Sequence, residues 1–240
     1  MRLRLYRFFS AFLMVGIIFV AALLFVLIVC NVKTYNFVGN TVYQENEIKR
    51  LVVTERYDTN VIIGSIMSYI RPKKGIPFVS RVRIKPAGLN TVKVEITEKK
   101  LFGVSKLPDE RYLYYDSDYN VCEISERLVE GIKTVELPAL TKDPVVGKKL
   151  PVDDGTIKSL EILDKELPKR EVTVDRTKLS DDGSIVLYKG NIEIRLGPRT
   201  NLADKIARLP YILPTIENQS GILHVEDFSE ENTDIVFEKT

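Results

Sequence analysis

The longest apolar stretch of the chain lies near its N-terminus, at residues 8–30, where no position carries a charged side chain. As an α-helix rising 1.5 Å per residue it would be about 34 Å long, enough to cross a hydrocarbon core of about 30 Å. A soluble core helix would show a polar face at 3.6-residue spacing, and this stretch is apolar all round. The pattern predicts a transmembrane helix.

A cleavable signal peptide is the alternative, and it would have an apolar region of only about 7–15 residues before a site of small side chains. Val20, Ala21 and Ala22 suit such a site by size, but the apolar run continues to Val29. Its length therefore favours an uncleaved anchor.

Orientation follows from the flanking charges. Arg2, Arg4 and Arg7 precede the apolar run, and positive residues are retained on the cytoplasmic side. We therefore expect residues 1–7 to be a cytoplasmic tail, residues 8–30 to span the cell membrane once, and the rest of the chain to lie outside, a type II arrangement.

Residues 31–100 show short periodic patterns that predict five elements. Tyr35 and Phe37 share one face of an expected strand at residues 35–38, which Gly39 ends. Two helices follow, each with a stripe of apolar residues at i, i+3, i+4 spacing, and Pro72 ends the second. The stripes are Ile48, Leu51 and Val52, and then Ile63, Ile66, Met67 and Ile70.

Two strands complete this part, at residues 81–85 and 92–97, and both alternate strictly between apolar and polar positions. A polar turn at residues 86–90 joins them, so they should form a hairpin with one face buried. Its buried side chains should pack on the helices that carry Leu51 and Ile66. The apolar positions are Val82, Ile84, Val92, Val94 and Ile96.

Residues 101–240 are rich in strand patterns. We expect strands at residues 111–115, 120–124, 171–174, 184–188, 191–196, 223–227 and 234–237. Asp153 fits the N-cap of one helix, and Pro210 should bend or end a second. The apolar positions of these helices are Leu160, Leu163 and Leu167, and Leu202, Ile206 and Leu209. The fold class is therefore α+β.

The order strand, helix, helix, strand, strand, with Phe-Val-Gly-Asn at residues 37–40 just after an anchor, resembles a POTRA domain. The arrangement is similar to the FtsQ/DivIB family of bacterial cell-division proteins. The most specific similarity is Gly-Asn-Ile-Glu-Ile-Arg-Leu-Gly at residues 190–197, followed by Lys-Ile-Ala-Arg-Leu at residues 205–209. The resemblance implies a POTRA-like domain at residues 31–100 and a β-rich domain with flanking helices at residues 101–240.

Two shorter segments bear on the same resemblance. Leu-Pro-Ala-Leu at residues 137–140 is similar to a segment of the family. The family also has an aspartate-turn-valine hairpin like the one expected around residues 116–121, usually with glycine where this chain has Tyr119. This departure concerns the geometry of the turn.

Charge and cysteine content narrow the classes of partner. The net charge is +2, and removing the three N-terminal arginines leaves about −1 for the remainder. A near-neutral domain has no electrostatic footprint for nucleic acid. Cys30 at the membrane edge and Cys122 provide neither an intradomain disulfide nor a cysteine-rich metal site.

Motifs for catalysis are sparse. The single histidine, His224, lies between Leu223 and Val225 in an expected strand, a setting more typical of a structural or surface residue. The chain has no Gly-x-Ser-x-Gly, His-Glu-x-x-His or phosphate-loop motif.

Acidic and basic clusters fit structural roles better than sites. Asp116, Asp118 and Asn120 match the first ligands of a calcium loop, but Val121 and Arg127 replace its glycine and glutamate. A solvated turn is the better interpretation. The basic run at residues 71–74 fits a helix end whose cations complement the dipole, or else a contact with anionic lipid or polymer.

The resemblance implies a non-enzymatic scaffold that binds the bitopic division proteins FtsL and FtsB/DivIC and helps to regulate septum formation. Besides these partners we expect contact with the lipid bilayer through the N-terminal helix, and no cofactor, metal, nucleic acid or small-molecule substrate. A membrane-anchored extracytoplasmic cell-wall enzyme or regulator is the alternative, because the carboxylate spacing for glycan hydrolysis is set only in the folded chain.

In this family the main partner adds a strand to the edge of the last sheet. The matching stretch is residues 227–237, with residues 223–225 leading into it. Phe228, Ile235 and Phe237 are the candidate hot spots, and their alternative role is to close the domain's own core. The expected partner-binding residues are Leu223, Val225, Asp227, Phe228, Ile235, Val236 and Phe237.

Overall fold

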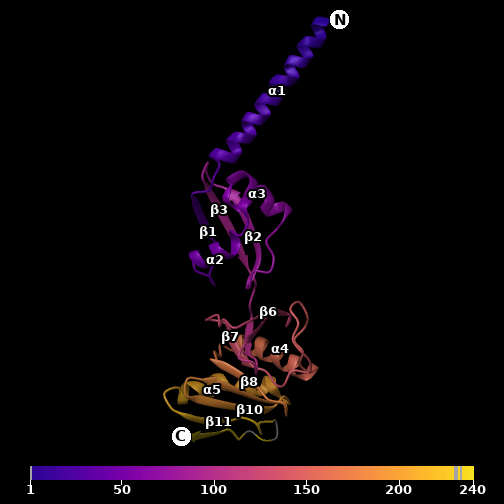
Figure 1. Ribbon diagram of the computed structural model, residues 1–240. Coiled ribbons are helices and arrows are strands. Elements are labelled where there is room, and N and C mark those ends of the chain that lie inside the picture. Colours follow the sequence, from indigo (N-terminus) through magenta and orange to yellow (C-terminus); the bar gives the residue numbers. More distant parts are fainter. Residues whose placement is uncertain (1, 230–231, 233) are drawn as a thin grey trace. The chain divides into compact units, whose positions relative to one another are not determined.

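The computed structural model describes residues 2–229, 232 and 234–240. Contacts divide the chain into two units, Met1–Lys99 and Lys100–Thr240. The described residues form a mixed fold of helices and strands, with a three-stranded sheet in the first unit and a nine-stranded sheet in the second (Figure 1).

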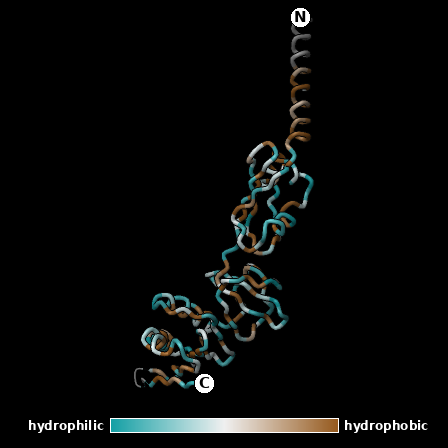
Figure 2. The backbone as a smooth tube through the Cα atoms, turned by 90° about the vertical axis from the view of Figure 1, so that its left-hand side faces the viewer, coloured by the Kyte–Doolittle hydropathy of each residue, from teal (hydrophilic) through white to brown (hydrophobic). Residues whose placement is uncertain are grey.

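The first helix, α1 (Arg2–Val29), is long and apolar enough to cross a membrane. Its stretch Phe12–Val29 has a mean hydropathy of 3.3, and none of it is buried inside the protein. Figure 2 shows this part of the chain in brown. The end of α1 is bound to the rest of the unit, because Asn60 Nδ2 donates to the Val26 carbonyl at 2.7 Å and Asn90 Nδ2 donates to the Val29 carbonyl at 2.8 Å.

The sheet of the first unit has the order β1-β3-β2. As predicted, β2 and β3 pair as an antiparallel hairpin, with Ile84 opposite Val94. The first strand runs parallel to β3. The bounds are β1 (Thr34–Val38), β2 (Val79–Pro86) and β3 (Thr91–Glu98), with α2 (Glu45–Val52), the 3₁₀ helix η1 (Arg56–Thr59) and α3 (Val61–Ile70) between β1 and β2.

The core of this unit lies between the sheet and the helices. All five apolar positions expected from the hairpin are buried there, together with Ile48 and Val52 from α2 and Val61 from α3. Leu51 is half-buried and packs against this cluster. Alternation along β2 and β3 therefore predicted the buried face correctly.

The prediction of which face of α3 is buried was wrong. Ile66 is 53% exposed, and the buried residues of α3 are Val61, Gly64, Ser65 and Ser68. A Cβ on Gly64 would lie 2.9 Å from the Tyr57 carbonyl oxygen, so close packing against η1 needs a small residue there. Ser65 and Ser68 can be buried because their hydroxyls donate to backbone carbonyls. Close packing, rather than hydrophobicity, selects the inner face of α3.

The sheet of the second unit has the order β12-β11-β10-β9-β8-β7-β4-β5-β6. It combines antiparallel neighbours with three parallel pairs, β4–β7, β7–β8 and β10–β11. The strands are β4 (Gly103–Lys106), β5 (Tyr112–Tyr115), β6 (Val121–Ser125), β7 (Lys133–Glu136), β8 (Arg176–Leu179), β9 (Ser184–Lys189), β10 (Ile192–Pro198), β11 (Gly221–His224) and β12 (Val236–Lys239).

Two helices, α4 (Asp154–Lys169) and α5 (Leu202–Ile216), contact each other and share one core with this sheet. Asp153 caps α4 as predicted, since its side chain accepts a hydrogen bond from the Thr156 backbone N–H at 3.0 Å. The expected apolar positions of both helices are buried. Helix α5 continues through Pro210 and Pro214, because its buried stripe continues to Ile216 and compensates for the lost backbone hydrogen bonds.

Other sequence predictions for this unit need correction. Residues 171–174 form no strand, because Glu171 has a φ of 56° and turns the chain directly after α4. The expected strand at residues 223–227 is β11, which ends at His224, and the one at residues 234–237 is β12, which begins at Val236. The hairpin of β9 and β10 through Gly190 was predicted correctly.

Candidate functional site: an open sheet edge

The strand β12 lies at one end of the nine-stranded sheet (Figure 1, near the C mark). It pairs with β11 in antiparallel register, with Val236 opposite His224 and Lys239 opposite Gly221. Among the described residues no strand pairs with its other side. An unpaired strand side presents backbone N–H and carbonyl groups that another strand can bind.

The register defines which backbone groups face outward. The Thr240 N–H donates to the Ser220 carbonyl at 3.1 Å. Because alternate residues of an antiparallel strand form the ladder hydrogen bonds, residues 236 and 238 also face β11. Phe237 and Lys239 therefore direct their backbone N–H and carbonyl groups to the open side.

The hydrogen bonds between β11 and its other neighbour, β10, support this assignment of inward and outward backbone groups. The Gly221 N–H donates to Asn191, and the Val225 N–H donates to Arg195, on the side of β10. Odd-numbered residues of β11 thus face β10, which leaves the even-numbered residues to pair with β12.

One face of this edge carries a group of charged side chains. His224 Nδ1 is 2.8 Å from Glu226 Oε1, and His224 Nε2 is 3.5 Å from Glu238 Oε2. The hydrogen bond with Glu226 raises the pKa of His224 above its usual value, against a smaller opposing effect of burial. Val236, opposite His224 in the register, is 58% exposed and provides an apolar position beside this charged group.

The opposite face of the edge belongs to the core. Leu223, Val225 and Phe228 are buried, and the Phe228 ring lies 4.9 Å from the Arg208 guanidinium. Ile235 and Phe237 are half-buried and pack against the same cluster. Thus Phe228 closes the domain's own core, the alternative considered for all three hot-spot candidates, whereas Ile235 and Phe237 pack against that core with part of each side chain exposed.

Of the seven expected partner-binding residues, Asp227 and Val236 are the two that are exposed. The structure brings all seven onto β11, β12 and the segment between them, and Glu230, Glu231 and Thr233 of that segment lie outside the described residues. The side chains of Leu223 and Val225 are buried and pack in the core of the second unit.

Two residues that support the edge were missed by sequence reasoning. A Cβ on Gly221 would lie 2.2 Å from the Glu238 carbonyl oxygen and 2.8 Å from the Phe237 ring, so β12 packs directly over this glycine. A glycine at the start of an alternating strand was the available signal.

Lys205 is the second. It is buried, and its Nζ donates to the Leu196 carbonyl at 2.8 Å and to the Pro198 carbonyl at 3.2 Å. Burial lowers the pKa of this ammonium group below the usual lysine value. The lysine within the Lys-Ile-Ala-Arg-Leu segment therefore holds the end of β10 to α5.

The calcium-loop candidate forms a turn. Asp116 Oδ1 accepts from the backbone N–H groups of Asp118, at 3.0 Å, and Asn120, at 2.8 Å. Tyr119 has a φ of 58°, the left-handed conformation that glycine favours, and its hydroxyl donates to Asp164 at 2.7 Å. The hydrogen bond to Asp164 thus anchors the Tyr119 side chain at a turn position whose backbone conformation favours glycine.

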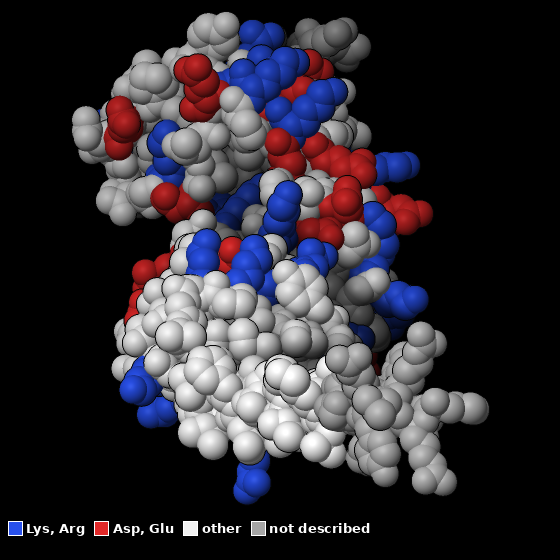
Figure 3. All heavy atoms as spheres, turned by 90° about the horizontal axis from the view of Figure 1, so that it is seen from above, with Lys and Arg blue, Asp and Glu red and all other residues white. Residues whose placement is uncertain are grey.

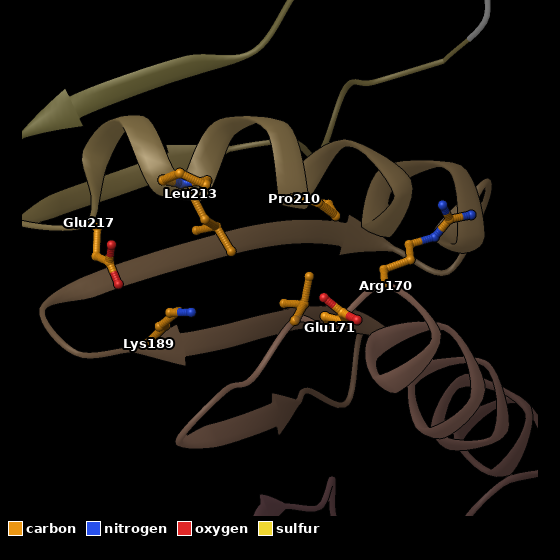
Figure 4. A pocket seen from close by; sticks show the side chains of 8 residues that line it. Arg170, Glu171, Lys189, Pro210, Leu213 and Glu217 are labelled. Carbon is orange, nitrogen blue, oxygen red and sulfur yellow. The ribbon is translucent and has the colours of Figure 1, made fainter.

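A recess of about 230 Å³ lies where the end of α4, the end of β9 and α5 meet (Figure 4). Its charged side chains are Arg170, Glu171, Lys189 and Glu217. The eight residues that line it include neither histidine nor cysteine. Among the described residues, no group of three or more His, Cys, Asp or Glu side chains is arranged to hold a metal ion.

No protein-family model matches the chain, and no curated protein matches it either.

Proposed function

We propose that this protein is a membrane-anchored scaffold of the bacterial division machinery, of the FtsQ/DivIB type, that binds FtsL-like and FtsB/DivIC-like bitopic proteins. Support comes from one apolar N-terminal helix, followed at once by the order strand, helix, helix, strand, strand. The observation that carries the proposal is the open side of β12, where residues 237 and 239 direct backbone groups outward.

The mechanism is binding without turnover. A partner segment adds to β12 as a tenth strand, and its main chain pairs with the outward groups of Phe237 and Lys239. Main-chain pairing is largely indifferent to sequence, so neighbouring side chains supply specificity. Val236 offers the apolar contact, while Glu226 and Glu238 favour a partner segment that carries cations.

In the cell, this scaffold resides in the cell membrane with its N-terminus in the cytoplasm and concentrates at the division septum. By holding its bitopic partners beside the membrane it helps to regulate septum formation. The POTRA-like interpretation of residues 31–100 belongs to the same proposal.

The test uses proline at a position where the strand itself loses no hydrogen bond. Lys239→Pro removes an N–H that faces the open side, whereas the inward pairs at residues 236, 238 and 240 remain. We expect the full-length variant, in detergent, to bind the FtsL- and FtsB/DivIC-like partners at least about tenfold more weakly than wild type, because main-chain hydrogen bonds dominate strand addition.

Lys239→Ala is the matched control, since it removes the same side chain and keeps the N–H; it should bind like wild type. If Lys239→Pro and Lys239→Ala both bind as strongly as wild type, the partner does not add to β12, and the first unit becomes the next surface to test. A loss shared equally by both variants would assign the effect to the lysine side chain instead.

A further inference from the structure

The helix α3 presents an exposed, largely apolar face. Ile62, Ile66, Tyr69 and Ile70 recur at helical spacing and are 37–67% exposed, and α3 contains no charged residue. Its opposite face packs on the sheet, where the Ser68 hydroxyl approaches the Ile84 carbonyl at 3.3 Å. An exposed stripe of large apolar side chains on one helix indicates a surface that is covered in the assembled state.

The position of α3 in the fold indicates what covers it. The N–H of Val61, its first residue, donates to the carbonyl of Cys30, the residue directly after α1, at 2.8 Å. The Asn60 side chain, which caps α3, also donates to the Val26 carbonyl inside α1. The helix thus begins within one hydrogen bond of the apolar segment long enough to span a membrane, and Figure 1 shows it beside the lower end of α1.

Another exposed apolar residue lies near the end of α1, on a different element. Leu89, in the turn between β2 and β3, is 63% exposed. Its neighbour Asn90 donates from Nδ2 to the carbonyls of Val29, at 2.8 Å, and Asn31, at 2.7 Å. Two separate elements of the first unit therefore place exposed apolar side chains beside the end of α1.

The charges around this surface complement an anionic membrane. Arg71 and Lys74, directly after α3, are exposed, whereas Lys73 is held by the buried carboxylate of Asp58 at 2.6 Å. The Arg83 guanidinium lies 4.3 Å from the centre of the Tyr69 ring. Figure 3, a view from above, shows a broad area without Lys, Arg, Asp or Glu side chains. Apolar side chains bordered by cations and an aromatic ring are typical of a surface that lies in the membrane interface.

We propose that α3 and the β2–β3 turn rest on the lipid surface, with Ile62, Ile66, Ile70 and Leu89 among the headgroups and Arg71 and Lys74 against anionic phosphates. The bilayer is the occupant because this surface is continuous with α1. The inference needs α1 to span the membrane but is independent of any role in cell division. In this arrangement the first unit itself contacts the bilayer, rather than being attached to it through α1 alone.

The chain has no tryptophan, so one substitution creates a single fluorescent reporter. Ile66→Trp would be placed in the full-length protein and reconstituted into liposomes of phosphatidylcholine and phosphatidylglycerol. We expect its emission to be blue-shifted, quenched by lipids brominated on the acyl chains, and protected severalfold from iodide in the buffer. Leu89→Trp should behave in the same way from an independent element.

Val38→Trp is the control within the same unit. Val38 is similarly exposed but lies at the other end of β1, about 13 Å along the strand from Thr34. Its tryptophan should be quenched by iodide and not by brominated lipid. In the Ile66→Trp protein, adding Arg71→Glu and Lys74→Glu should reduce quenching by brominated lipid.

Equal iodide quenching of the Ile66→Trp and Val38→Trp proteins would overturn the proposal. It would also be overturned if Ile66→Trp were protected in detergent as well as in liposomes, increasingly with protein concentration, because a second copy of the chain would then cover α3. Lipid quenching unaffected by the two glutamate substitutions would contradict the part assigned to Arg71 and Lys74.

Discussion

His224 is positioned so that its charge depends on pH near neutrality. It lies on β11 between the carboxylates of Glu226 and Glu238, and the hydrogen bond with Glu226 raises its pKa above 6.5 in the folded state. A raised histidine pKa stabilises the fold fully below about pH 6.5, and this contribution is lost as the pH rises through the folded-state value.

We therefore expect the unfolding free energy of the full-length protein in detergent to fall as the pH rises above about 6.5, by on the order of 0.5 kcal/mol for this partly exposed pair. His224→Gln should remove this part of the pH dependence. Denaturant titration at several pH values measures it, and an identical pH profile for the variant would show that the ion pair has no effect on stability.

The hairpin of the first unit allows a matched comparison of two adjacent residues. Val94 is fully buried, whereas Lys93 is exposed and pairs with Glu95 at 3.2 Å. Val94→Asp buries a carboxylate without a partner, so we expect a loss of about 3–5 kcal/mol. Lys93→Asp should cost only about 1 kcal/mol or less. Urea unfolding of both variants decides; similar losses would mean that the two faces are assigned incorrectly.

At the scale of elements, α3 gives the strongest test because its packing contradicts its hydrophobic pattern. Ser65 is buried and its hydroxyl donates to the Val61 carbonyl at 2.6 Å, while Ile66 is half-exposed. Ser65→Leu should destabilise the first unit by about 1–3 kcal/mol through overpacking. Ile66→Ser should change stability by about 0.5 kcal/mol or less. If the order of the two effects is reversed, α3 packs through its isoleucines.

Strict alternation made β2 and β3 predictable, because each buries one face and exposes the other over eight residues. The strands β4, β7 and β8 were not predicted. Each is only four residues long, and β7 lies between two parallel partners, β4 and β8, that come from distant parts of the chain. Such strands are defined by their neighbours rather than by their own pattern.

The candidate site was predictable in location but not in residue detail. The expected stretch, residues 227–237, overlaps β12 at residues 236 and 237, and the strand continues to Lys239, beyond the expected strand at residues 234–237. Which face of β12 Phe237 occupies depends on how β12 pairs with β11. In the observed register Phe237 lies opposite the buried Leu223. A one-residue change of register reverses which side chains a strand buries, and a local pattern of four residues does not define that register.

At the scale of the whole molecule, topology can be tested directly. Three arginines precede the apolar stretch of α1, and the remaining chain is nearly neutral. We expect protease added to intact spheroplasts to digest residues 31–240, and the N-terminus to be retained, because positive residues stay in the cytoplasm. Immunoblotting with an antibody against the second unit measures the digestion. Protection of that unit, or a mature N-terminus at Leu23, would contradict an uncleaved type II anchor.

The short connection between α1 and β1 has a consequence for how partners are found. Only residues 30–33 separate the two elements, and Asn60 and Asn90 bind the last turn of α1. Four residues span at most about 14 Å when fully extended. With α1 in a membrane, this connection therefore keeps the first unit close to the membrane surface. Encounters with other membrane proteins then take place by diffusion in two dimensions. Confinement to one layer raises the effective concentration of any anchored partner above that of a soluble competitor with the same binding segment.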